Sequence, residues 1–261
     1  MLKVNLWVVL LLILTIRVNA QKTAPLFDKL LHISKNDTLP YRLLKPVNPQ
    51  AKQTFPLVIF LHGAGERGND NEVQIQHISE LFLDTRNRGK YPCYVIAPQC
   101  PKKQSWSNFR ARNEAPTLSE KPTRPMELVI ELIEKALKEY PIDQTRIYIT
   151  GLSMGGYGTW DLIARYPNKF AAAVPICGGG DPKTAPAIKH VPIWAFHGAL
   201  DRIVAPEESR KMIRGLHEAG GLPGYTEYPD IEHNSWVHAY KEPHLIHWLF
   251  EQKLQASAAA K

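Results

Sequence analysis

The chain contains, at positions 149–156, the sequence Ile149-Thr150-Gly151-Leu152-Ser153-Met154-Gly155-Gly156. β-branched and aromatic residues at 146–150 predict a strand before it, and residues 154–165 predict a helix after it. A Gly-x-Ser-x-Gly sequence at such a junction predicts a sharp turn that lifts the serine hydroxyl clear of the backbone. Glycines stand two residues before and after the serine because the turn leaves no room for side chains there. Ser153 is therefore the candidate nucleophile, at a helix N-terminus whose free amides favour negative charge.

The rest of the chain alternates predicted strands with predicted helices and contains no internal repeat. Besides 146–150, strands are predicted at 41–44 (an edge strand), 57–61, 94–97, 171–176, 193–196 and 225–228. Helices are predicted at 126–140, 207–219 and 243–253. This alternation predicts an α/β fold with a mostly parallel central sheet flanked by helices. Only residues 178–190 separate two of the strands, which argues against a large lid.

The first twenty residues have the features of a signal peptide. Lys3 gives a positive start, residues 6–16 are apolar, and Val18-Asn19-Ala20 supplies small residues at the cleavage point. We therefore expect residues 1–20 to be removed, leaving one catalytic domain at 21–261 that is secreted or periplasmic. The apolar run is too short to span a bilayer comfortably, so we expect no stable membrane insertion after removal of the signal.

Charge and cysteine content exclude several classes of protein. The net charge is +7 without a dense run of Lys and Arg, so nucleic-acid binding has no specific support. Cys93 and Cys100 flank a predicted strand and would lie about 20 Å apart in an extended chain, too far for a bridge; a disulfide of Cys177 stays open. Asn36-Asp37-Thr38 fits a glycosylation sequon, whose use the sequence does not determine.

A serine nucleophile needs a histidine base that is oriented by a carboxylate. Asp201 follows the strand at 193–196, and His233 follows the strand at 225–228, in the order Ser, acid, His that α/β-hydrolases use. We therefore predict Ser153, Asp201 and His233 as the triad. The alternatives are His238 as the base and, as the acid, Asp181, Glu207, Glu208 or Asp230.

Ester or amide cleavage also needs donors for the oxyanion. We expect them to be the backbone amides of Met154 and of Ala64, in the glycine-containing loop after the strand at 57–61. Glu66 and Arg67 are expected to form a structural ion pair that braces this loop. His62 and His197, each followed by glycine at a strand end, are expected to be structural.

No metal and no cofactor is expected. His244 and His247 have a helical spacing compatible with a metal site, but no third ligand is evident. The long polar segment 99–125 is expected to face the substrate, with Gln99, Trp106 and the later Trp236 as candidate contacts. Arg110 and Arg112 could bind an acidic sugar, although a solvated loop face is the simpler interpretation.

Taken together, the motifs resemble those of exported α/β-hydrolase esterases related to dienelactone hydrolases, polyhydroxybutyrate depolymerases and feruloyl or acetylxylan esterases, some labelled predicted peptidases. The matching segments are His62–Gly68, Ala97–Pro101, Gly151–Gly156, Trp194–Gly198 and His233–Trp236. The resemblance implies an α/β-hydrolase fold, the triad Ser153, Asp201 and His233, and an oxyanion hole from Ala64 and Met154. Dienelactone hydrolases use a cysteine nucleophile, so the serine points away from that reaction.

The sequence therefore predicts a secreted serine esterase that cleaves carboxylic esters, including carbohydrate-linked acetyl or feruloyl esters. The expected partner is a small-molecule or polysaccharide-linked ester; the sequence leaves the particular ester and the oligomeric state open. One alternative is a serine peptidase that uses the same residues on an amide. The other is a non-catalytic binding protein of the same fold, which would usually lack a triad residue or the oxyanion loop.

Overall fold

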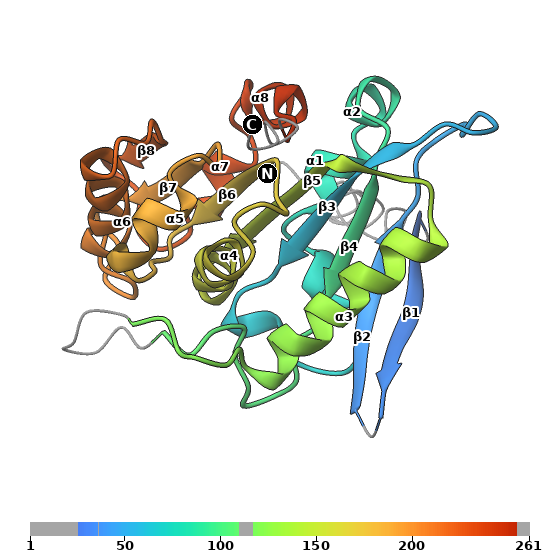
Figure 1. The fold of residues 1–261 in the computed structure, drawn as a ribbon, viewed down its shortest axis with the longest axis horizontal. Coiled ribbons are helices and arrows are strands. Elements are labelled where there is room, and N and C mark those ends of the chain that lie inside the picture. The colour runs from blue at the N-terminus through green and yellow to red at the C-terminus, as the bar shows by residue number, and fades with distance from the viewer. Residues whose placement is uncertain (1–25, 36, 110–116, 255–261) are drawn as a thin grey trace, which may run out of the picture.

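A single eight-stranded sheet forms the centre of the molecule, in the order β1-β2-β4-β3-β5-β6-β7-β8 (Figure 1). The computed structural model describes residues 26–35, 37–109 and 117–254. The strands β1 and β2 form an antiparallel hairpin, β2 pairs antiparallel with β4, and every other neighbouring pair is parallel. The strands are β1 (Phe27–Ser34), β2 (Asp37–Leu44), β3 (Phe55–Leu61), β4 (Tyr94–Pro98), β5 (Ile142–Leu152), β6 (Ala172–Ile176), β7 (Trp194–Gly198) and β8 (Gly224–Tyr228).

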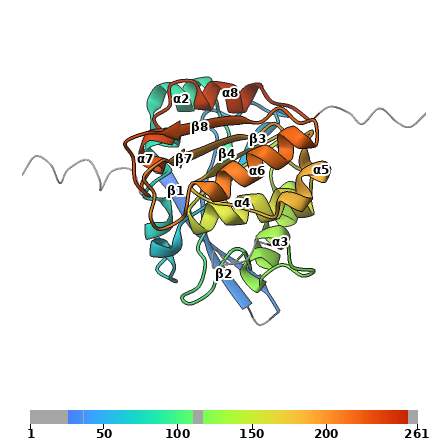
Figure 2. The ribbon, with the colours of Figure 1, turned by 90° about the vertical axis from the view of Figure 1, so that its left-hand side faces the viewer.

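Helices cover both faces of this sheet (Figures 1 and 2). They are α1 (Ser79–Leu83), α2 (Thr85–Lys90), α3 (Arg124–Glu139), α4 (Met154–Arg165), α5 (Ala185–Ile188), α6 (Glu207–Glu218), α7 (Trp236–Ala239) and α8 (Leu245–Glu251). Three short 3₁₀ turns complete the described elements, η2 (Ala64–Glu66), η3 (Val73–Ile75) and η4 (Pro182–Thr184). None of the helices in the described ranges is long and apolar enough to span a membrane.

Two hydrophobic cores lie on opposite faces of the sheet, because side chains alternate along each strand. In β3, Leu57, Ile59 and Leu61 belong to the core shared with α3, α4, α5 and α6. Val58 and Phe60 belong to the core shared with α1, α7 and α8. All seven residues of β3 are buried, as expected for a strand covered on both faces. The predicted three-layer α/β fold is confirmed.

The predicted edge strand at 41–44 is wrong in its position. The strand β2 lies between β1 and β4, and β1 is the edge of the sheet. The sequence does not predict β1, because its buried residues Phe27 and His32 do not alternate regularly with exposed ones. The sequence also does not predict short helices such as α1 and α7, because four or five residues carry too little periodicity to reveal a helix.

The connections that carry the site leave the carboxyl ends of the parallel strands. Residues 178–190, between β6 and β7, contain only η4 and the four-residue α5. No helix or strand is found at 99–109 or 117–123, the described parts of the long segment that follows β4. The expected signal peptide, the sequon at Asn36, and Arg110 and Arg112 lie outside the described residues.

The three cysteines are free and buried, so Cys177 forms no disulfide. Burial raises the pKa of Cys93 and of Cys100 to about 12.

Candidate active site

The turn from β5 to α4 places Ser153 in a backbone conformation that side chains rarely adopt. Its φ is 53° and its ψ is −114°. A Cβ atom on Gly151 would lie 2.3 Å from the carbonyl oxygen of Gly155, and one on Gly155 would lie 1.8 Å from that of Leu61. Both contacts are impossible, so the two glycines allow the turn to pack directly against the end of β3. The strain of such a backbone costs about 1–3 kcal/mol and is stored at the serine.

The structure brings Ser153, His233 and Asp201 into one hydrogen-bonded chain. Ser153 Oγ lies 2.9 Å from His233 Nε2, and His233 Nδ1 lies 2.7 Å from Asp201 Oδ2. The Asp201 carboxylate can only accept, so His233 Nδ1 carries the proton and Nε2 accepts from the serine hydroxyl. Ser153 and His233 are half-buried, whereas the Asp201 side chain is fully buried. This arrangement can make a serine hydroxyl nucleophilic.

The loops after β7 and β8 pack closely enough to bring the acid to the base. A Cβ on Gly198 would lie 2.2 Å from the carbonyl oxygen of Glu232, so this position requires glycine. The amide of Leu200 donates to the carbonyl oxygen of Ile231 at 3.0 Å. The two loops are therefore joined through their backbones just before Asp201 in one loop and just before His233 in the other.

Asp201 is held as a carboxylate by the groups around it. Its burial raises its pKa, but hydrogen bonds from His197, His233 and the amides of Val204 and Ile203 outweigh that effect. The pKa is therefore well below its usual range. Asp201 Oδ1 accepts from the two amides at 2.9 Å each, which fixes the plane of the carboxylate and directs Oδ2 at the imidazole.

The alternative acids and the alternative base have other roles. Asp181 caps the turn η4 through the amide of Lys183, and Asp230 is exposed. Glu207 pairs with Arg214, and Glu208 pairs with Lys211. His238 is exposed, and its ring lies 5.4 Å from that of Tyr228. His247, half of the weak metal candidate, pairs with Glu251.

The two segments that carry the expected oxyanion donors lie against each other. Ala64 begins η2 after β3, and Met154 begins α4 directly after the serine. The amides of the first helical residues have no acceptor within their own helix. A Cβ on Gly63 would lie 2.8 Å from the Leu152 side chain, so the η2 loop packs onto the serine turn at this glycine.

The expected Glu66–Arg67 ion pair is wrong. Glu66 accepts from the Gln76 side chain at 2.9 Å and lies 3.5 Å from His77 Nε2. Arg67 donates to the carbonyl oxygens of Ala64 at 2.8 Å and of Gln104 at 3.3 Å. Both residues brace the η2 loop through other partners, Glu66 through residues 76–77 and Arg67 through Ala64 and Gln104.

His62 has the structural role expected of it. Its Nδ1 lies 2.6 Å from the carbonyl oxygen of Gly63, and its Nε2 accepts from the amide of Cys100 at 2.9 Å. Burial lowers its pKa to about 4, which is consistent with a neutral ring. The ring thereby ties the loop after β3 to the loop after β4.

Two of the three expected substrate contacts are corrected by the structure. Gln99 and Trp106 are both 0% exposed. Gln99 accepts from the amide of Asn71 at 2.7 Å, and Trp106 Nε1 donates to the carbonyl oxygen of His62 at 3.0 Å. Both side chains hold loops together from inside the core, where substrate does not reach. A polar or aromatic residue in a loop gives no local signal of whether it points inward.

Trp236 is half-buried beside the triad and remains a candidate contact. Its ring lies 5.4 Å from that of His233 and 5.4 Å from that of His77.

Cys177 was not expected at the site. Its sulfur, an Asp201 oxygen and a His233 nitrogen lie within 4.8 Å of one another. Its position directly after β6 could have indicated this, since the triad gathers at the carboxyl ends of the strands.

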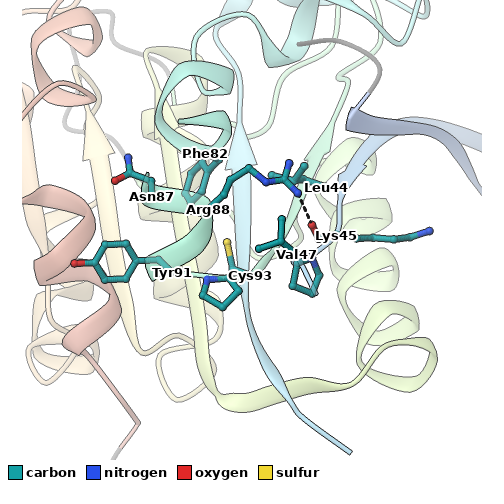
Figure 3. Close-up of a pocket in the computed structure, with 10 residues that line it drawn as sticks. Leu44, Lys45, Val47, Phe82, Asn87, Arg88, Tyr91 and Cys93 are labelled. Atoms are coloured by element: carbon teal, nitrogen blue, oxygen red, sulfur yellow. Dashed lines mark hydrogen bonds between the residues drawn. The ribbon is translucent and has the colours of Figure 1, made fainter. Parts of the chain in front are cut away.

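The cavity drawn in Figure 3 lies at the start of β4, whereas the triad lies at the carboxyl ends of the parallel strands. The Arg88 guanidinium donates to the carbonyl oxygen of Lys45 at 3.3 Å, and Cys93 belongs to the same lining. Its volume of about 10 Å³ has room for one water molecule at most. It therefore has no room for an ester substrate.

Comparison with known proteins agrees with this geometry. The sequence profile of the family described as Phospholipase/Carboxylesterase matches residues 42–242. A solved structure titled as a thermostable esterase is 42% identical, with a TM-score of 0.82, and the match covers 89% of this chain and 64% of that one.

Two curated proteins show more distant similarity. The bifunctional acetylxylan esterase/xylanase XynS20E of Neocallimastix patriciarum is 30% identical over 114 residues, which are 42% of this chain and 17% of that protein. The carboxylesterase SOBER1 of Arabidopsis thaliana is 25% identical over 77% of this chain and 92% of its own length. The chain thus spans about a sixth of the first relative and nearly all of the second.

Proposed function

Because this chain belongs to the phospholipase/carboxylesterase family of α/β-hydrolases, we propose that it is an exported serine esterase that uses Ser153, His233 and Asp201. The observation that carries this proposal is the chain of hydrogen bonds from Ser153 Oγ through His233 to Asp201, at 2.9 and 2.7 Å. The strained φ of 53° at Ser153 supports it, because strain of this kind collects at functional sites.

In the proposed reaction, His233 Nε2 takes the hydroxyl proton of Ser153 while the serine oxygen attacks the ester carbonyl carbon. The tetrahedral intermediate collapses when the bond to the alcohol oxygen breaks, and His233 returns its proton to that leaving oxygen. Water then attacks the acyl-enzyme in the same way, releasing the acid and restoring the serine. Asp201 keeps Nδ1–H of the imidazole in place and stabilises its protonated form.

The amides of Ala64 and Met154 are the proposed donors to the oxyanion. They begin η2 and α4, and these two segments pack together at Gly63 and Leu152. Removing one such donor costs roughly 2.7–4 kcal/mol of transition-state stabilisation in other serine hydrolases. Backbone donors cannot be deleted by a side-chain substitution. The glycines at which the two segments pack together are therefore the positions to substitute.

Carbohydrate-linked acetyl or feruloyl esters are the proposed substrates. Support comes from the acetylxylan esterase relative, whose matching region covers 42% of this chain. The short connection between β6 and β7 is consistent with a cleft without a large lid, which would admit an ester carried on a polymer. Export, proposed from the signal-like residues 1–20, would place the enzyme where such polymers are found.

Labelling with a fluorophosphonate probe tests the nucleophile. We expect the wild-type protein to be labelled and Ser153→Ala to be neither labelled nor active, with turnover reduced roughly a millionfold if the triad acts as a unit. Ser34→Ala, on the edge strand β1, is the matched control and keeps wild-type labelling. Labelling of the Ser153→Ala protein at the wild-type rate would refute the assignment.

A panel of matched substrates tests the reaction class. Acetylated xylan fragments, feruloylated sugars, short-chain aryl esters and the corresponding amides are compared by kcat/KM. We expect the esters to exceed their amides, and the sugar esters to exceed the aryl esters of the same acyl group. Faster cleavage of amides would favour the peptidase alternative. If the enzyme is labelled by the probe but turns over none of these substrates, the proposed substrate class is wrong.

A further inference from the structure

The acid of the triad is shared between two histidines. His197 lies in β7, four residues before Asp201, and is 0% exposed. Its Nε2 lies 3.2 Å from Asp201 Oδ2, the same oxygen that His233 Nδ1 contacts at 2.7 Å. One carboxylate oxygen therefore faces two imidazole rings, one inside the core and one at the site.

The protonation of the buried ring follows from its partners. His197 Nε2 also lies 3.0 Å from the carbonyl oxygen of Val204, which like the carboxylate can only accept. Nε2 must therefore carry a proton, because an unprotonated nitrogen would face two acceptors without water, and its single N–H is divided between the Val204 carbonyl oxygen and Asp201 Oδ2. At the other end, Nδ1 lies 2.7 Å from Ser209 Oγ, and the Ser209 hydroxyl donates to the carbonyl oxygen of Gly178 at 2.8 Å. The ring is thus fixed at both ends.

We propose that His197 is a positioning residue that tunes the triad: its Nε2–H shares the Asp201 oxygen that faces His233, and so limits how strongly that carboxylate stabilises protonated His233. A carboxylate that accepts a second hydrogen bond has less negative charge available for the first. The base must be neutral to take the serine proton, so this sharing keeps the site competent at lower pH. The proposal rests on the triad proposed above.

Other titratable groups around the pair come from several elements. Cys177, directly after β6, and Tyr157, on α4, both lie within electrostatic reach of Asp201. Glu227, on β8, lies within electrostatic reach of His197, and Glu208, on α6, lies within reach of Tyr157. All four remain in place when His197 is replaced, so a change in the pH profile is attributed to the shared oxygen.

Two substitutions of His197 separate the hydrogen bond to Asp201 from the bulk of the ring. The amide nitrogen of Gln takes the place of Nε2 and can still donate to Asp201, whereas that of Asn takes the place of Nδ1 and reaches only toward Ser209. Ser209→Ala is the control, because it removes the partner of Nδ1 and leaves the Asp201 contact intact. The folded fraction of each variant is measured by its thermal unfolding transition.

The readout is kcat/KM for an aryl ester as a function of pH. We expect the acid limb to move to higher pH by roughly one unit in His197→Asn, the scale expected for one hydrogen bond to a charged group. It should stay at the wild-type position in His197→Gln and in Ser209→Ala, and KM should change little in all three. An acid limb that shifts in His197→Asn but stays at the wild-type position in His197→Gln cannot come from a purely structural role of the ring.

Two results would overturn the inference. One is an acid limb that is unchanged in His197→Asn, which would mean that the ring only fills space. The other is a limb that moves to lower pH, which would mean that His197 strengthens the Asp201–His233 contact. Both results require an enzyme labelled at Ser153, so they differ from failure of the proposed function, in which the wild-type protein itself is neither labelled nor active. If His197→Asn does not fold, the acid limb of kcat/KM is compared between wild type and His197→Gln at the same folded fraction. Any shift of the acid limb in His197→Gln then overturns the proposal.

Discussion

Asp201 is the residue on which the site depends electrostatically. Its side chain is fully buried, and a lone carboxylate in that position would be costly. It is tolerated because two imidazoles and two backbone amides donate to it. These four donors fix both its charge and its direction, so that the oxygen nearest His233 meets the imidazole at 2.7 Å.

The lowered pKa of Asp201 predicts a particular dependence of stability on pH. The unfolded chain binds the proton at a higher pH than the folded protein does, so the carboxylate stabilises the fold above about pH 4. That stabilisation is lost as the pH falls toward the folded pKa. We expect the Tm of the wild-type protein to fall more steeply between about pH 4 and pH 2 than that of Asp201→Asn.

Exposed Asp230 provides the control for this measurement. Asp230→Asn should follow the wild-type curve of Tm against pH, because the Asp230 side chain is exposed and is not among the groups that hydrogen bond to Asp201. Parallel curves for wild type and Asp201→Asn would show that the donors around Asp201 do not favour its charged form.

At the scale of elements, the site depends on how closely α4 approaches the sheet. The helix begins against the end of β3, where Gly155 leaves no room for a Cβ. Its next residue, Gly156, would place a Cβ 2.4 Å from the carbonyl oxygen of Ile176, at the end of β6. Glycines therefore set the distance between the helix N-terminus and two neighbouring strands, and with it the height of Ser153 above the sheet.

Substituting Gly155 by alanine should separate these elements. We expect Gly155→Ala to destabilise the protein by about 2–4 kcal/mol and to abolish labelling of Ser153, because the new methyl group meets the backbone of Leu61. Gly89→Ala is the matched control, since Gly89 is in α2 and a Cβ added there would meet nothing within 4 Å. That substitution should be neutral or stabilise by up to about 1 kcal/mol. Chemical denaturation measures both, and equal stabilities would contradict the argument.

At the scale of the whole molecule, the sheet gathers loops from distant parts of the chain at one edge. The loops after β3, β5, β7 and β8 carry Ala64, Ser153, Asp201 and His233, the proposed oxyanion donor, nucleophile, acid and base. Ser153 and His233 are 80 residues apart in the sequence and come into hydrogen-bond contact because β5, β6, β7 and β8 are consecutive parallel neighbours. This edge is where ligands bind in open parallel sheets.

Export is a prediction about the whole chain. Phe27 is the first residue of β1, so cleavage after Ala20 would leave every described strand intact. We expect the protein recovered from the medium or periplasm of a secreting host to begin at Gln21, as measured by intact mass. Replacing Ala20 with a bulky residue should slow the cleavage. Recovery of a protein that retains Met1 would contradict the prediction.

The amino-acid sequence by itself located the serine turn, the strand at 57–61 buried on both faces, and the order of Ser153, Asp201 and His233. These features are local, because turn glycines, apolar runs and residues just after strands leave their signal within a few positions. The tertiary structure alone decided that Gln99 and Trp106 point into the core, that β1 and not β2 is the edge, and that His197 shares the oxygen of Asp201. These features depend on which strands are neighbours in the sheet and on which side chains are buried when the elements pack. Both are determined by segments that are distant in the sequence, so no local pattern reveals them.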